Sequence, residues 1–365
     1  MTKNLLFFIH SLGMGGAEKV LLSYVRSLVD RYGYKITVAT NEDSSQHIVA
    51  KSIADVATVV HFDFDGSKKN NFIEKLRFSF KKQSKINKLI DEHDVVIDFL
   101  DGDFFKYLKR CKKPKVMWLH SSFFNLEKRK RHMSKRCASY DRVVLICQDM
   151  LTELQREHVS WLHKARVIYN PFDFNRLLNL AEQAAENSQE ETVLLEQDYI
   201  LSVSRLDEQT KDIEGLLLAY AKAVEGGLDK KLLIIGDGPD RTHLERVAQR
   251  LALQDRVHFL GLKANPYVWM KHADTFVLSS KGEGFGLVLV EALYLCGRVI
   301  STDCPVGPSE ILERGRLGTL IPMGDVSALA EALSNTGPKL PNIDLDKYSS
   351  ESVLRDFDTM LQELL

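Results

Sequence analysis

Two basic residues in the second half of the chain have a spacing that suits a diphosphate. Arg205 follows the strand-like run "YILSVS", and Lys211 lies six residues later, just before an apolar helical run. A guanidinium offers a fork of parallel N–H donors and an ammonium offers a compact charge, so the two can bind linked phosphates. Two such cations standing alone would be better interpreted as surface charges.

The string "SSKGEGFGLVLVEALYLCG", residues 279–297, adds two carboxylates and a glycine-rich turn. Gly284 and Gly286 precede a helix whose free N–H groups and positive end favour phosphate. Glu283 lies in the loop, where it can reach a sugar hydroxyl. Glu291 lies within an otherwise apolar helix, where a carboxylate needs partners that offset its desolvation. The paired hydroxyls of a ribose are suitable partners.

A further glycine turn, "GDGPD", follows the strand-like run "KLLII". Gly236 and Gly238 can adopt positive φ and let backbone N–H groups approach a ligand closely. Turns of this composition are common. This one therefore supports a ligand site only together with the charged residues described above.

The N-terminal turn "SLGMGGAEK" follows "NLLFFI" and raises a rival interpretation, a nicotinamide site. A dinucleotide-binding fingerprint needs G-x-G-x-x-G, in which the last glycine lets helix and strand pack closely. Glu18 stands at that third position, which weakens the oxidoreductase interpretation. Glu42 and Asp43 nevertheless follow the second strand, about where a ribose partner would lie.

The composition is that of an ordinary two-domain globular protein. A chain of 365 residues is long for one core, and 44% hydrophobic with 27% charged residues is typical of soluble proteins. No apolar run is long enough to span a bilayer and no secretory signal is recognisable, so we expect a cytoplasmic protein. The five cysteines show no C-x-x-C or zinc-like spacing, which indicates reduced, mostly buried thiols.

The net charge of −1 conceals an uneven distribution. Residues 66–136 contain 20 Lys plus Arg against 8 Asp plus Glu, a net charge of +12, so the rest of the chain carries −13. Solvated helix faces explain any single lysine, but not the clusters "KRCKKPK" and "KRKRHMSKR". A basic helix with interspersed aromatic residues suits an anionic membrane surface or a phosphorylated partner. No nucleic-acid-binding motif accompanies the charge.

Strand-like and helix-like runs alternate in both halves of the chain, which predicts an α/β fold. The strands read as continuous buried runs, the pattern of a parallel sheet. Two such halves predict two doubly wound, Rossmann-like sheets that face a cleft, with ligands outside the carboxyl ends of the strands. The expected divisions are a domain over 1–175, a linker over 176–197, a domain over 198–345, and a C-terminal helix over 346–365 that packs toward the first domain.

Taken together, S-R-L…K, G-D-G-P and E-G-F-G-L-x-x-x-E resemble the motifs of the retaining glycosyltransferases of family 4, or group 1, which have the GT-B architecture. The resemblance covers almost the whole chain. It implies an acceptor-binding first domain and a second domain that binds a nucleotide-diphosphate sugar, most simply a UDP-sugar. The donor-binding residues that it implies are Gly15, Gly16, Arg205, Lys211, Gly236, Gly238, Leu260, Gly261, Leu262, Glu283, Gly284, Phe285, Gly286, Leu287 and Glu291.

The resemblance also implies a catalytic set of four residues, His120, Arg205, Lys211 and Glu283. Arg205 and Lys211 would stabilise the leaving diphosphate, and Glu283 would hold donor-sugar hydroxyls while Glu291 binds the ribose. His120, at the end of "KVMWLH", would lie beside the donor sugar as a hydrogen-bonding and charge-stabilising group. Without the resemblance it would be interpreted as a strand-end histidine with a structural role.

Acceptor binding is assigned to four residues of the first domain, Gly13, Met14, Asp101 and Asp103. The string "DGD" over 101–103 resembles the D-x-D metal motif of a different glycosyltransferase architecture, and such carboxylates can bind Mg²⁺. Because Arg205 and Lys211 already supply positive charge at the phosphates, we expect no metal and no cofactor.

The implied reaction transfers a hexose or N-acetylhexosamine, with retained configuration, to a hydroxyl of a membrane-associated glycan. The string "DCPVGPSEIL" resembles members that build lipid-linked, lipopolysaccharide or capsule glycans. The basic region 66–136 would then dock on the inner face of the cytoplasmic membrane, and nucleic acid is not expected as a partner. Two alternatives remain: a GT-B epimerase or phosphorylase, and a non-catalytic nucleotide-sugar-binding subunit.

Overall fold

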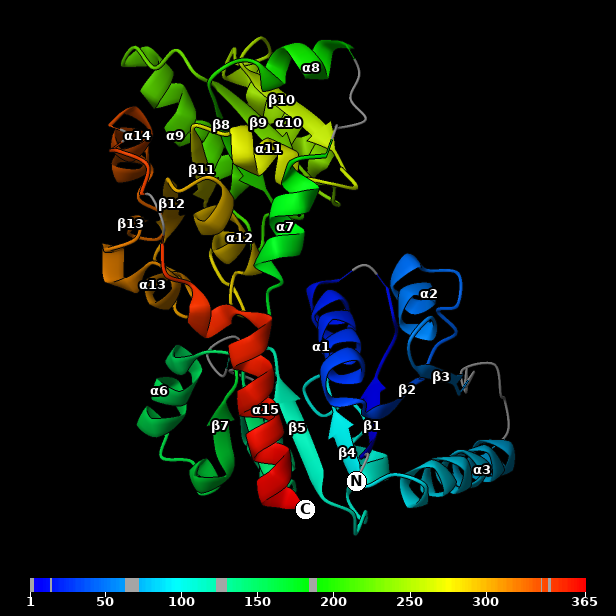
Figure 1. Ribbon diagram of the computed structural model, residues 1–365. Coiled ribbons are helices and arrows are strands. Elements are labelled where there is room, and N and C mark those ends of the chain that lie inside the picture. Colours follow the sequence, from blue (N-terminus) through cyan, green and yellow to red (C-terminus); the bar gives the residue numbers. More distant parts are fainter. Residues whose placement is uncertain are drawn as a thin grey trace. The chain divides into compact units, whose positions relative to one another are not determined.

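The chain folds into two compact units, which a computed structural model describes over residues 3–13, 15–62, 72–122, 130–183, 189–335, 337–340 and 343–365 (Figure 1). The first unit contains the residues up to Phe172 together with Asp346–Leu365, and the second contains Asp173–Leu345. Each unit has its own parallel sheet, which confirms the doubly wound α/β fold predicted from the alternation.

The described strands of the first unit form one seven-stranded sheet in the order β3-β2-β1-β4-β5-β6-β7. The order reverses between β1 and β4, whose register pairs Leu5 with Val95 and Phe8 with Asp98. Strands β4 and β5 are buried along their whole length, which is why they read as apolar runs. The strands are β1 (Asn4–Ile9), β2 (Lys35–Thr40), β3 (Thr58–His61), β4 (Val95–Asp98), β5 (Lys115–Leu119), β6 (Arg142–Leu145) and β7 (Ala165–Val167).

Helices connect these strands and cover the sheet. Helix α1 begins after the N-terminal glycine turn and ends at Gly33, whose left-handed conformation lets its N–H bond the Leu28 and Val29 carbonyls. The helices of the first unit are α1 (Gly16–Tyr32), α2 (Ile48–Ala54), α3 (Phe72–Asp91), α4 (Phe105–Leu108), α5 (Lys130–Ala138), α6 (Gln148–Arg156) and α15 (Ser350–Leu364), with 3₁₀ turns η3 (Leu162–Lys164) and η5 (Asp346–Tyr348).

Helix α15 brings the end of the chain back onto the first unit, beside α1 (Figure 1). Phe357 contributes its ring to a buried aromatic cluster, with ring centroids 5.5 Å from Tyr24 and 5.3 Å from Trp118. Tyr24 also donates a hydrogen bond to the Tyr169 carbonyl at 2.8 Å. The C-terminal helix is therefore part of the core of this unit.

The described strands of the second unit form a six-stranded sheet in the order β10-β9-β8-β11-β12-β13. Its order reverses between β8 and β11, which pair through Thr275 with Ile200 and Phe276 with Leu201. The strands are β8 (Tyr199–Val203), β9 (Lys231–Ile235), β10 (Val257–Gly261), β11 (Thr275–Leu278), β12 (Val299–Thr302) and β13 (Thr319–Ile321).

The helices of the second unit carry its conspicuous apolar runs. Helix α9 buries Leu216, Leu217 and Tyr220 against the sheet, and α12 buries Leu289 and Leu293. They are α7 (Phe174–Ala181), α8 (Gln189–Leu195), α9 (Ile213–Glu225), α10 (Arg241–Arg250), α11 (Tyr267–His272), α12 (Leu287–Leu295), α13 (Pro308–Ile311) and α14 (Val326–Ser334), with the 3₁₀ turn η4 (Glu313–Gly315).

The expected linker over 176–197 is instead part of the second unit in its described portion. Helix α7 contacts α11 and α12, and the Phe174 ring packs at a tilt against Tyr294, with centroids 4.7 Å apart. Leu177 and Leu194 are buried. A few apolar residues at helical spacing suffice to bury one face of a short helix, and the acidic composition of the stretch conceals them.

Within the described ranges, none of the helices combines the length and the apolar character that crossing a bilayer requires. All five cysteines are free thiols, and four of them, Cys137, Cys147, Cys296 and Cys304, are buried. These thiols agree with the sequence expectation.

Replacing Phe357 with alanine tests whether α15 is part of the core. Because it removes a ring from a buried aromatic cluster, Phe357→Ala should lower the free energy of unfolding of the first unit by about 3–5 kcal/mol. Urea unfolding followed by tryptophan fluorescence measures this. Phe80→Ala is the matched control, since Phe80 is 70% exposed and its loss should cost less than about 0.5 kcal/mol. Equal effects of the two changes would contradict the packing.

Candidate functional site

Most of the candidate residues lie at one edge of the second sheet, where its parallel strands end. Arg205 follows β8, the turn at Gly236 follows β9, and Glu283 lies in the turn after β11. Strands β8 and β11 are neighbours at the point where the strand order reverses. Ligands of doubly wound sheets bind at this edge and at this reversal.

The centre of the site is an ion pair between Lys211 and Glu283. The Lys211 Nζ lies 2.5 Å from Glu283 Oε1, and the two side chains are only 19% and 10% exposed. Ser280 donates a second hydrogen bond to the same carboxylate oxygen at 2.6 Å, and the Ser279 hydroxyl bonds the Lys211 carbonyl at 2.9 Å. The turn after β11 and the turn before α9 are thus joined through these side chains.

The turn before α9 is held by a second set of charges. Glu208 accepts the N–H groups of Ile213 and Glu214, at 2.8 and 3.2 Å, and so caps the helix. Burial raises the pKa of Glu208, and these two hydrogen bonds oppose the rise. Lys281 Nζ lies 2.7 Å from Asp212 Oδ1. The capping role of Glu208 escaped the sequence analysis, because its place before the helix is evident only once the helix start is known.

Gly236 and Gly238 are required by backbone packing. A Cβ on Gly236, which has φ +140°, would lie 1.8 Å from the Ser204 carbonyl oxygen, and one on Gly238 would lie 2.2 Å from that of Leu206. The two glycines let the turn after β9 pack against the segment that carries Arg205. Ser204 N and Leu206 N complete this contact with hydrogen bonds to Ile235 and Asp237 carbonyls.

Helix α12 begins at this edge, directly after Gly286 in the left-handed conformation (φ +95°). Its N-terminus presents free N–H groups, as the sequence predicted for a phosphate site. Phe285 is buried, and its carbonyl oxygen would lie 1.9 Å from a Cβ on Gly307. Gly284 precedes Phe285 in this turn, and Leu287 is the first residue of α12. The glycine at 307 therefore allows the turn before α13 to support the turn before α12.

Glu291 has a partner that the sequence did not indicate. Tyr267, at the start of α11, donates a hydrogen bond to Glu291 Oε1 at 3.2 Å. Burial and the neighbouring carboxylate both raise the pKa of Tyr267, which keeps its hydroxyl protonated as a donor. The Glu291 side chain is partly exposed rather than buried, so it remains accessible to a ligand.

The remaining candidates of the second unit are more open. The Arg205 side chain is exposed and has no hydrogen bond or ion pair to the described part of the chain. At the end of β10, Gly261 has φ +68° and Leu262 is 70% exposed, while Leu260 is half-buried. An exposed leucine beside a glycine turn offers an apolar surface on which a base can lie.

The N-terminal glycine turn lies at the edge of the first sheet where the carboxyl ends of its parallel strands meet. Gly15 precedes α1, and a Cβ on it would meet the Glu18 carboxylate at 2.2 Å, because that side chain folds back over the helix start. Gly16 is the first residue of α1, and a Cβ on Gly13 would meet nothing within 4 Å. Met14 lies outside the described residues.

His120 follows β5 at this edge and has an unusual environment. Burial lowers its pKa, while the Asp101 carboxylate and a hydrogen bond to the Phe99 backbone oppose the fall. Its Nε2 is buried and has no partner among the described residues. Asp101, which the sequence assigned to the acceptor, accepts hydrogen bonds from residues 120 and 121. Asp103 is exposed to solvent, although desolvation by the surrounding chain raises the pKa of its carboxyl.

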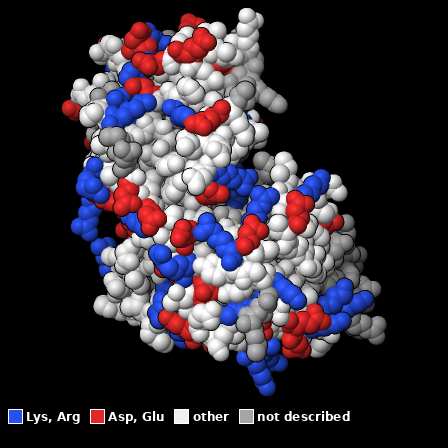
Figure 2. Space-filling view, in the orientation of Figure 1, with Lys and Arg blue, Asp and Glu red and all other residues white. Residues whose placement is uncertain are grey.

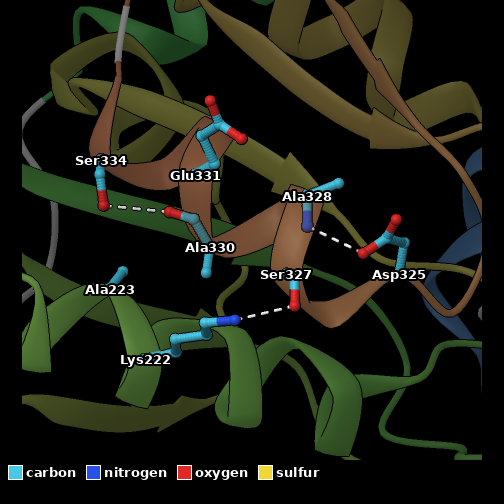
Figure 3. A pocket seen from close by; sticks show the side chains of 8 residues that line it. All are labelled: Lys222, Ala223, Asp325, Ser327, Ala328, Ala330, Glu331 and Ser334. Atoms are coloured by element: carbon cyan, nitrogen blue, oxygen red, sulfur yellow. Dashed lines mark hydrogen bonds between the residues drawn. The ribbon is translucent and has the colours of Figure 1, made fainter.

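Among the described residues, no group of three or more His, Cys, Asp or Glu side chains is arranged to hold a metal ion. A depression of about 530 Å³ lies between α9 and α14, where Lys222 donates to the Ser327 hydroxyl at 2.8 Å (Figure 3). Asp325 caps α14 there by accepting the Ala328 N–H. These polar contacts link and cap the helices, and none of the motif residues lines the depression.

Two family models match the chain. Residues 14–176 match "Glycosyltransferase Family 4", and residues 183–336 match "Glycosyl transferases group 1". The chain belongs to the group 1 glycosyltransferases.

Relatives of this glycosyltransferase match it over different shares of its length. An N-acetylgalactosamine-N,N'-diacetylbacillosaminyl-diphospho-undecaprenol 4-alpha-N-acetylgalactosaminyltransferase of Campylobacter jejuni is 26% identical over 89% of the chain and 88% of its own length. An uncharacterized glycosyltransferase of Methanocaldococcus jannaschii is 31% identical over 47% of the chain, and the match spans 42% of that protein.

Solved structures show the GT-B fold for this glycosyltransferase. Anabaena HepE in complex with UDP and glucose has a TM-score of 0.74 at 20% identity, over 99% of both chains. The lipopolysaccharide outer core galactosyltransferase WaaB has a TM-score of 0.69 at 18% identity, over 99% of this chain and 100% of its own.

Replacing Gly236 with alanine tests the backbone packing of the site. Because the new Cβ would overlap the Ser204 carbonyl oxygen, Gly236→Ala should lower the melting temperature and displace the segment of Arg205. Gly324→Ala is the control, because Gly324 also has positive φ (+79°) but open space around it, so only backbone strain of about 1–2 kcal/mol is expected. Differential scanning calorimetry compares the two. A smaller loss in Gly236→Ala would contradict the clash.

Proposed function

We propose that the second unit binds a nucleotide-diphosphate sugar, most simply a UDP-sugar, and that the protein transfers its hexose or N-acetylhexosamine to a hydroxyl. The observation that carries the proposal is the Lys211–Glu283 pair, placed at the carboxyl edge of the sheet beside the start of α12. A cation, a carboxylate and free helix N–H groups match the phosphates and hydroxyls of such a donor. The UDP-bound relative of the same fold supports the choice of nucleotide.

Each charged residue then has a chemical task. Lys211 and the exposed Arg205 stabilise the charge that develops on the leaving diphosphate, together with the N–H groups before α12. Glu283 accepts hydrogen bonds from sugar hydroxyls, and Ser280 holds its carboxylate in place. Glu291 binds the ribose hydroxyls, with Tyr267 as its fixed neighbour. Leu260, Gly261 and Leu262 support the base.

The proposal also covers the configuration at the anomeric carbon and the need for a metal ion. The resemblance implies front-face attack by the acceptor hydroxyl with retained anomeric configuration. Two cations and a helix N-terminus supply positive charge at the phosphates, so the reaction is proposed to proceed without a metal. His120, with its unpartnered Nε2, is proposed to accept a hydrogen bond from a sugar hydroxyl.

The acceptor is proposed to be a lipid-linked or other membrane-associated glycan, and the first unit to dock on the inner face of the cytoplasmic membrane. The Campylobacter relative is named for a diphospho-undecaprenol substrate. In the first unit, a groove of about 620 Å³ between α3 and the segment 106–113 is lined by Lys106, Lys109, Arg110, Lys112 and Lys113, with Asp91 as an acidic member.

The surface near α3 supports a weak, reversible attachment. Figure 2 shows Lys and Arg side chains around this end of the first unit, with Asp and Glu between them. Phe80, on α3, is 70% exposed and offers an apolar contact. The string 128–136, also assigned to this surface, lies partly outside the described residues. Each basic residue near an anionic surface adds roughly 1 kcal/mol to binding.

Thermal stabilisation by nucleotides tests the donor site. At 100 times its Kd, UDP should stabilise the wild-type protein by about 2.7 kcal/mol. Lys211→Ala should lose this response because it removes the phosphate-binding ammonium. Lys222→Ala, a Lys→Ala change on α9 in the same unit, should keep it. Differential scanning fluorimetry with UDP, GDP, ADP and NADH provides the comparison.

The outcomes separate the alternatives. A response to NADH alone would reject the glycosyltransferase donor site and restore the oxidoreductase interpretation. Release of UDP from a UDP-sugar only when a glycan acceptor is added would support transfer, whereas isomerised sugar without an acceptor would indicate an epimerase. Binding without turnover of any UDP-sugar would favour the non-catalytic subunit.

Charge reversal in the groove tests membrane docking. The triple variant Lys109→Glu, Arg110→Glu and Lys112→Glu should bind vesicles of phosphatidylglycerol at least tenfold more weakly, because three exposed cations become anions. Co-sedimentation measures it, with phosphatidylcholine vesicles as the neutral comparison.

The matched control for charge reversal carries three changes in the second unit, Lys222→Glu, Arg246→Glu and Arg250→Glu, and should bind these vesicles like the wild type. Unchanged binding in the groove variant would reject this surface, whatever the response to UDP.

A further inference from the structure

The turn between β4 and α4 is held more firmly than its position at the surface requires. Asp98, at the end of β4, accepts the Tyr140 hydroxyl at 2.6 Å and the Phe104 N–H at 3.2 Å. Burial raises the pKa of Asp98 to about 7, and these two hydrogen bonds oppose the rise. The Asp101 N–H donates to the Trp118 carbonyl at 3.0 Å. The turn is therefore tied to β5 and to the segment between α5 and β6.

Asp101 stands at the tip of this turn in a conformation that side chains seldom adopt. Its φ is 47°, in the left-handed region that Gly and Asn occupy most easily. Such backbone strain persists where surrounding contacts impose it, and it concentrates at functional sites. At Asp101 the backbone N–H bond to Trp118 is joined by contacts of the side-chain carboxylate.

The Asp101 carboxylate binds the residues that carry and follow the histidine. Oδ1 accepts the backbone N–H of His120 at 2.8 Å and that of Ser121 at 3.3 Å, and Oδ2 accepts the Ser121 hydroxyl at 2.7 Å. A single side chain thus fixes both backbone N–H groups where the chain leaves β5.

The His120 ring packs beside an aromatic ring of the preceding strand end. The ring lies 4.9 Å from the Phe99 ring and makes a hydrogen bond to the Phe99 backbone. Nε2 is buried and has no partner in the described chain, so it is the ring nitrogen open to a ligand. In the tautomer that carries the proton on Nδ1, Nε2 has a lone pair that can accept a hydrogen bond.

We propose that Asp101 is a positioning residue, whose carboxylate fixes residues 120–121 and so holds the His120 ring with Nε2 open to substrate. This role differs from the acceptor contact that the sequence suggested for Asp101. It rests on the proposed function only in that His120 is taken to contact substrate. The orientation of the ring can be measured without any substrate.

The charged and titratable groups around this turn come from two elements. The β4–α4 turn supplies Asp101 and Asp103, and α5 supplies Arg136, which donates to the Gly102 carbonyl at 3.4 Å. Cys137, also on α5, stays protonated because burial raises its pKa. Asp101 is the group whose charge raises the pKa of His120 against the effect of burial.

Two substitutions separate the charge of Asp101 from its hydrogen bonds. Asp101→Asn keeps an acceptor oxygen and tolerates positive φ, so the ring should stay in place and lose only the nearby anion. The pKa of His120 should then fall below its wild-type value. Asp101→Gly relieves the backbone strain but removes both oxygens, so the ring should be released and its pKa should rise toward the ordinary 6.5.

The experiment is a pH titration of the full-length 15N-labelled protein, observed through the histidine ring nitrogens by NMR. His120→Gln assigns the signals, and Asp55→Asn, at an exposed carboxylate after α2, is the control that should match the wild type. The wild type and Asp101→Asn should show a protonated Nδ1 and a bare Nε2. Asp101→Gly should show a mixture of the two tautomers.

Activity provides the second readout. On a UDP-sugar that the protein turns over, Asp101→Gly should lower kcat about tenfold or more with little change in the KM for the donor, and Asp101→Asn should lose less. A single wild-type tautomer in Asp101→Gly, with its melting temperature preserved, would overturn the proposal. If no UDP-sugar is turned over, the proposed function fails, while the NMR result still decides whether Asp101 orients His120.

Discussion

Parallel pairing of the strands is the constraint on which both candidate sites depend. In a parallel sheet all carboxyl ends lie along the same edge, so the turns that follow different strands become neighbours although they are distant in sequence. Arg205, Gly236 and Glu283 meet in this way at one edge of the second sheet, and Gly15, Asp101 and His120 share an edge of the first. The helices that begin at these edges add free N–H groups.

Close contact between backbones makes these turns specific. Gly236, Gly238 and Gly307 each lie where a Cβ would overlap the carbonyl oxygen of a neighbouring turn. The absence of a side chain is therefore a packing requirement, which a ligand need not explain. The packing still serves the site, because it holds the segments that carry Arg205 and Phe285 in fixed positions.

The polar side chains of the sites are held by partners from adjacent turns. Lys211 is paired with Glu283, Glu291 with Tyr267, and the backbone of His120 with Asp101. Such contacts fix the orientation of a functional group before a ligand arrives, which lowers the entropy that binding must overcome. At these sites the Arg205 guanidinium and His120 Nε2 have no partner in the described chain, so both can bind a ligand.

The sequence by itself determined the fold class, the parallel sheets and the family, because buried strands, glycine turns and charged motifs are local patterns. It also predicted that Lys211 and Glu283 belong to one site, and the two side chains form an ion pair. Only the tertiary structure decided what each one contacts. The hydrogen bonds of Glu291 with Tyr267 and of Asp101 with residues 120–121 join turns from different strands, and no local spacing encodes them. The placement of α7 within the second unit depended likewise on a face that only packing against α11 and α12 makes visible.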